Sequence, residues 1–189
     1  MGKKQVIIVT DGDRTAQSVV EKAASSVGGR TISASGGNPT PISGEELVEK
    51  VLQARSEPVL VMVDDCGKQE KGPGEKALET LVKDERLDIL GVIAVASNTG
   101  KVEGVPVDFS VSRNQKIVPG PVDKDGIPEP EGHRKVEGDT VDILNRLDVP
   151  IVVGIGDLGK MDKADRIQDG AQVTTKAIRE IMERSKTLH

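Results

Sequence analysis

The sequence predicts an α/β fold in which helices cover both faces of a mostly parallel sheet. Three short apolar runs, at residues 6–10, 59–63 and 151–155, each end at a turn rich in Gly and Asp. Unbroken β-branched runs of this length are typical of strands that are buried on both faces. Helical patterns alternate with these runs. The alternation predicts a three-layer α/β/α sandwich with a five-stranded, Rossmann- or flavodoxin-like sheet.

Each expected element has a local signal. Apolar positions at helical spacing and the pair Gly28-Gly29 predict a first helix and its C-cap. Ser43 stands three residues before Glu46, the spacing of a capping box, and Pro73 suits the first turn of a helix. The expected strands are 6–10, 31–34, 59–63, 89–96 and 149–155, and the expected helices are 15–27, 43–55, 73–84, 139–147 and 174–185.

Residues 97–138 interrupt the alternation within what we expect to be a single domain spanning 1–189. The segment is rich in Gly, Pro and charge, and weak strands are expected at 107–111 and 115–118. About 40 residues without a helix is long for a compact domain. We therefore expect a β-hairpin insertion or an exposed arm that docks to a partner and can be removed without loss of folding.

Composition limits the classes of function. The chain has 189 residues, a formal net charge of −5 and a single aromatic residue, Phe109. Without a Lys/Arg cluster or aromatic stacking platforms, a nucleic-acid partner is not expected. One cysteine, Cys66, excludes an internal disulfide. No apolar run approaches the ~20 residues of a membrane span, and no signal-peptide pattern is present, so we expect an intracellular protein without direct membrane insertion.

Acidic residues follow two of the predicted strands. Asp11 and Asp13 follow the first, and Asp64 and Asp65 follow the third. In a flavodoxin-like strand order, 2-1-3-4-5, all four would face one crevice, and a different order would separate them. Carboxylates of this kind could hold Mg²⁺ or Ca²⁺, as in topoisomerase–primase (toprim) phosphoryl-transfer sites, although the glutamate that begins that pattern is missing. Alternatively, the aspartates cap helices and shape turns, and no cofactor is needed.

Two glycine-rich turns could present backbone N–H groups to an anion. Residues 154–159 match G-x-G-x-x-G, and with Lys160 they match G-x-x-x-x-G-K. The context argues against a nucleotide, because no second strand with an acidic ribose ligand follows and Met161 replaces the Ser/Thr of a phosphate loop. The second turn, residues 67–76, leads into the helix expected at 73–84. The candidate ligand-binding residues at the two turns are Gly72, Gly74, Gly156, Gly159 and Lys160.

Eight segments of the chain together resemble one family. They are VTDGD at 9–13, GNPT at 37–40, SGEELV at 43–48, DD at 64–65, GPGEKA at 72–77, LGVIAVA at 90–96, GDT at 138–140 and VPIVVGIGDLGKM at 149–161. In this order, and over nearly the whole chain, they resemble the stage V sporulation protein AE family. The match is to its soluble member, which accompanies the membrane components of the spore dipicolinic acid transport system.

The resemblance implies a role in spore formation and germination, inside the developing spore and peripheral to its inner membrane. The implied partners are the membrane and soluble proteins of the transport system, with calcium dipicolinate as a candidate ligand. In that case the aspartates would contact calcium, and N–H groups near Gly72 or Gly156 would meet the carboxylates. The resemblance carries over no catalytic residue, so we expect a non-enzymatic accessory protein. A Mg²⁺-dependent phosphoryl-transfer or nucleotide-binding enzyme and a small-ligand sensor remain the alternatives.

Overall fold

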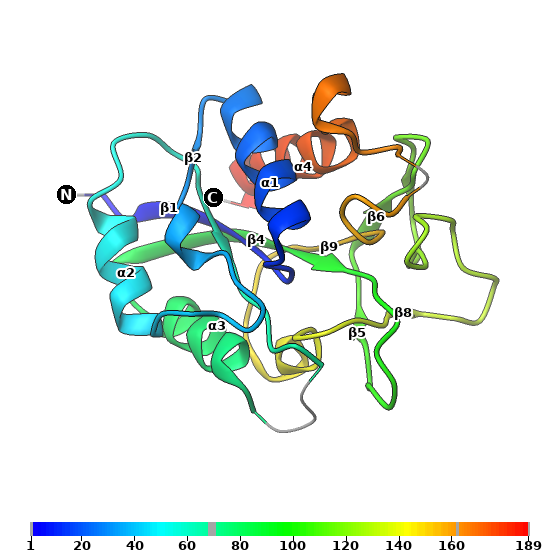
Figure 1. Cartoon of the computed structure of the whole chain (residues 1–189), viewed down its shortest axis with the longest axis horizontal. Helices are drawn as coiled ribbons and strands as arrows, with labels where there is room; N and C mark the ends of the chain where they lie inside the picture. The colour runs from blue at the N-terminus through cyan, green and yellow to red at the C-terminus, as the bar shows by residue number, and fades with distance from the viewer. Residues whose placement is uncertain (1, 68–70, 162, 189) are drawn as a thin grey trace.

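The computed structural model describes residues 2–67, 71–161 and 163–188 (Figure 1). Within these residues, seven strands form one sheet in the order β2-β3-β1-β4-β9-β6-β7. All neighbouring strands are parallel except β6 and β7, which form an antiparallel pair. The strands are β1 (Lys4–Val9), β2 (Arg30–Thr31), β3 (Val59–Met62), β4 (Leu87–Val95), β6 (Phe109–Val111), β7 (Ile117–Val118) and β9 (Val152–Ile155).

Helices pack on both faces of this sheet, as the sequence predicts. Ile7 and Val9 of β1 belong to one apolar cluster and Val6 and Ile8 to the other, because successive side chains of a strand point to opposite faces. The first cluster includes α1 (Arg14–Ser26) and α4 (Gln172–Leu188), and the second includes α2 (Gly44–Leu52), α3 (Pro73–Lys83) and the 3₁₀ helix η2 (Asp142–Arg146). The remaining elements are η1 (Ser33–Ser35), β5 (Val105–Pro106), β8 (Lys135–Val136) and η3 (Ile167–Asp169).

The flavodoxin-like strand order is wrong. β3 lies between β2 and β1, so the five expected strands have the order 2-3-1-4-5. Every residue of β3 is buried, which suits a strand with a neighbour on each side, whereas β2 is a two-residue strand with an exposed Arg30 and suits an edge. β1 and β3 still pair, with Val9 opposite Met62. The acidic turns that follow them therefore stay together.

Two expected elements are largely replaced by 3₁₀ helices. The strand expected at 31–34 ends at Thr31, and the 3₁₀ helix η1 follows it. The helix expected at 139–147 is the 3₁₀ helix η2, which begins only at Asp142. Thr140 has a φ of 65°, and this left-handed conformation is incompatible with a helix that starts at 139.

The segment 97–138 is not a dispensable arm. Its expected weak strands are β6 and β7, and they extend the sheet from five strands to seven. Phe109 and Val111 are buried in one apolar cluster, and Val105 and Val136 in the other. Removing the segment would strip both clusters of core side chains, so the expectation that its loss spares folding is wrong. The surface of the segment includes Ile127, which is 46% exposed.

Candidate functional site

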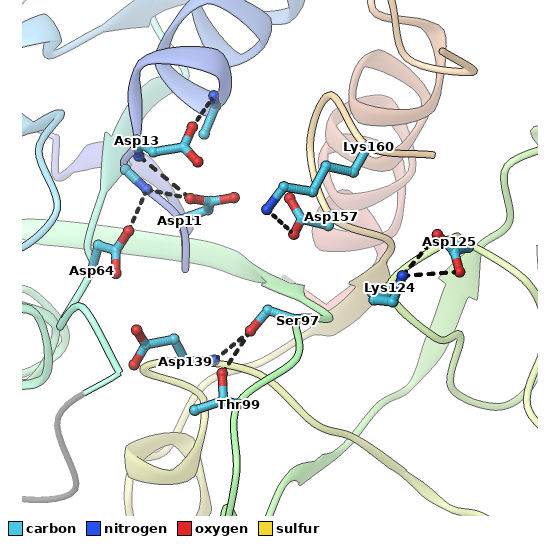
Figure 2. A network of polar contacts seen from close by, with 12 residues as sticks. Asp11, Asp13, Asp64, Ser97, Thr99, Lys124, Asp125, Asp139, Asp157 and Lys160 are labelled. Carbon is cyan, nitrogen blue, oxygen red and sulfur yellow. Dashed lines mark hydrogen bonds and ion pairs between the residues drawn. The ribbon is translucent and has the colours of Figure 1, made fainter. Parts of the chain in front are cut away.

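A cleft of about 430 Å³ opens at the carboxyl ends of β1, β3, β4 and β9 (Figure 2). The chain leaves β1 toward the face covered by α1, but it leaves β3 toward the face covered by α3. A crevice forms where neighbouring parallel strands diverge in this way. Figure 2 shows Asp11 and Asp13 from the turn after β1, Asp64 from the end of β3, and Asp157 with Lys160 from the turn after β9.

Asp11 lies at the centre of this acidic group. Its Oδ1 accepts hydrogen bonds from the backbone N–H groups of Gly12 (2.8 Å) and Asp13 (3.4 Å). Burial, together with the smaller effects of the nearby carboxylates of Asp13, Asp64 and Asp157, raises the pKa of Asp11 to about 7. The Asp11 carboxyl is therefore partly protonated near neutral pH.

Asp64 ties the turns after β1 and β3 together. Its carboxylate accepts from the N–H of Gly12 (3.2 Å) and from that of Cys66 (3.1 Å). The residue is 4% exposed, and burial raises the pKa of Asp64 to about 6, with the carboxylate of Asp139 acting in the same direction. Asp139 in turn accepts a hydrogen bond from the N–H of Gly67.

Asp13 faces the cleft but also caps a helix. Its Oδ1 accepts from the N–H of Ala16 at 2.8 Å, which satisfies a free donor in the first turn of α1. The interpretation of this aspartate as a helix cap is confirmed. The sequence signal was its place directly before the apolar helical stripe.

Asp65, Gly72 and Gly74 are placed apart from the cleft lining. The Asp65 carboxylate accepts from the N–H of Gly74 (2.6 Å) and of Glu75 (3.0 Å), at the start of α3. A Cβ on Gly74 would lie 2.6 Å from the backbone oxygen of Asp64, and one on Gly72 would clash with the Asp65 carboxylate. The two glycines thus let the acidic turn pack against the helix, and the N–H of Gly74 is already bonded within the protein.

Replacing Asp65 with Ala is expected to destabilise the protein by about 2 kcal/mol, because one buried and one partly buried N–H group in the first turn of α3 lose their acceptor. Asp65→Asn retains a side-chain oxygen and should cost less. Thermal unfolding followed by circular dichroism checks both variants. Equal melting temperatures for Asp65→Ala and the wild type would contradict the capping role.

The turn after β9 brings one of its candidate residues to the cleft. Lys160 lines the cleft, and its Nζ lies 2.9 Å from Oδ2 of Asp157. A Cβ on Gly156 would lie 2.5 Å from the backbone nitrogen of Gly126, and Gly159 has a φ of 81° beside Thr15. The glycines therefore serve close packing. Among the described residues after the motif, the first helices are the 3₁₀ helix η3 at Ile167–Asp169 and α4 from Gln172, whereas a dinucleotide fingerprint requires a helix that starts directly at the motif.

Two aspartates of the cleft were not among the predicted site residues. Asp157 stands inside the glycine motif and could have been found there as a third acidic strand end. Asp139 comes from the segment before η2, far from the strand ends in sequence, and carried no such signal.

Among residues 2–67, 71–161 and 163–188, no group of three or more His, Cys, Asp or Glu side chains is arranged to hold a metal ion. The metal site at Asp11, Asp13, Asp64 and Asp65 stays a prediction.

A family model described as stage V sporulation protein AE1 matches residues 5–185. The chain belongs to this family. No curated protein and no solved structure matches it. Family membership gives the chain a role in sporulation, and the family's description names a stage of that process without naming a reaction. In the part of the chain that the structure describes, none of the helices has the length and apolar character needed to span a bilayer.

Proposed function

We propose that this chain is a non-enzymatic accessory protein of the spore dipicolinic acid transport system and works through the membrane and soluble proteins of that system. The observation that carries the proposal is the family match over residues 5–185. The protein would act peripherally at the spore inner membrane during spore formation and germination.

The arrangement of the aspartates supports a binding role over catalysis. Of the four residues considered for a phosphoryl-transfer metal site, Asp13 and Asp65 accept hydrogen bonds from the first turns of α1 and α3. Asp11, Asp13 and Asp64 line the cleft, together with Asp139, Asp157 and Lys160. Because two of the four proposed metal ligands cap helices, the arrangement favours a binding role.

A second candidate function, a sensor of calcium dipicolinate, is favoured by the cleft itself. Carboxylate oxygens of Asp11 and Asp64 are the ligand type that Ca²⁺ takes. Lys160 is the cation on the opposite side of the cleft, where it could meet a dipicolinate carboxylate (Figure 2). Gly72 does not line the cleft, so the N–H groups near it are not expected to contact the dipicolinate carboxylates.

An amide NMR titration tests the sensor proposal, with Ca²⁺ alone, Mg²⁺ alone and calcium dipicolinate as the probes. We expect saturable shifts at residues 11–13, 64–67 and 157–160 with calcium dipicolinate. The variant Asp64→Asn should weaken binding about tenfold or more, because one oxygen ligand loses its charge. Asp148→Asn, an exposed aspartate elsewhere on the surface, is the matched control. A flat titration of the wild type would reject the sensor and leave the accessory proposal standing.

The accessory proposal needs a test of partner binding that preserves the fold. Deletion of residues 97–138 is unsuitable because the segment is part of the core. Ile127→Ser changes a side chain that is 46% exposed and lies in this segment, and Ile167→Ser, at 42% exposure in η3 and outside the segment, is its matched control. We expect Ile127→Ser, and not Ile167→Ser, to reduce co-sedimentation with membranes that contain the transport system's membrane proteins. Unchanged co-sedimentation of both variants would remove this segment as the docking element, and absence of wild-type binding would contradict the accessory role.

A further inference from the structure

We draw no further inference here: the strongest candidate, the cluster of aspartates in the cleft at the carboxyl ends of β1, β3, β4 and β9, belongs to the site already described, and no second observation in the described part of the chain points to a ligand there.

Discussion

The free energy of unfolding is expected to fall as the pH rises from about 4 to about 7, with Asp11 as the largest single contributor. The ordinary pKa of this carboxyl is 3.8, and burial raises it to about 7 in the folded protein. Between these two values the folded state binds more protons than the unfolded state. A folded-state pKa above the unfolded one therefore favours folding at low pH, and this advantage is lost as the pH rises through the window.

The difference between the two pKa values, 3.8 and about 7, limits the effect of Asp11. It can lower the free energy of unfolding by at most roughly 4 kcal/mol between pH 4 and pH 8. Asp64, whose pKa is raised to about 6, contributes in the same direction over a narrower window. Part of the effect at Asp11 is repulsion by Asp13, Asp64 and Asp157, so the two contributions are coupled and do not simply add.

The variant Asp11→Asn isolates this effect because it keeps an oxygen that can accept from the N–H of Gly12. We expect Asp11→Asn to be more stable than the wild type at pH 8, with a flatter dependence of stability on pH. Urea denaturation at pH 5, 6, 7 and 8 measures the free energy of unfolding of both proteins. Circular dichroism monitors the unfolding, because the chain has no Trp or Tyr. The exposed Asp148→Asn serves as the control and should parallel the wild type. Parallel curves for Asp11→Asn and the wild type would show that the Asp11 carboxyl titrates normally.

Replacing Asp165 with Ala is expected to lower the free energy of unfolding by about 3 kcal/mol or more. Asp165 is 1% exposed, and its carboxylate accepts from the N–H groups of Val173 (2.9 Å) and Thr174 (3.1 Å) and from the Thr174 hydroxyl (2.5 Å). These donors belong to the first turn of α4. The substitution leaves buried polar groups without an acceptor and removes a negative charge from a helix N-terminus.

The companion variant Asp165→Asn separates the two causes. It retains an oxygen for the N–H groups but loses the charge, so we expect a smaller loss than for Asp165→Ala. α4 packs against α1 and the sheet, and a frayed first turn should appear as faster amide exchange at Val173 and Thr174 in native-state hydrogen exchange. Protection of these amides that is unchanged in Asp165→Ala would contradict the role of Asp165 in holding the start of α4.

The sequence by itself determined the elements whose signals are local. Apolar runs marked β1, β3 and β9, which are buried, and their parallel pairing with neighbouring strands confirms the parallel sheet. The N-cap at Ser43 is present, with the N–H of Glu46 bonded to the Ser43 hydroxyl at 3.2 Å. Periodicity and capping act within one or two turns of chain, so they can be seen in a single sequence. The family resemblance was also available at this level, because it depends on the order of motifs alone.

Only the tertiary structure decided which elements are neighbours. Strand order depends on packing between distant segments, and the insertion of β3 between β2 and β1 has no local signature. The same reason explains why the short strands β6 and β7 were expected only weakly but extend the main sheet.

The chemistry of the aspartates was decided at the same tertiary level. Asp65 and Asp64 are adjacent in sequence, yet one carboxylate caps α3 and the other faces the cleft, because successive residues at a strand end point in different directions. Burial of Asp11, the proximity of Asp157 to Asp11 and that of Asp139 to Asp64 all require the folded sheet edge. Residue type and spacing could therefore mark the acidic turns, but only the assembled strands determine which carboxylates meet.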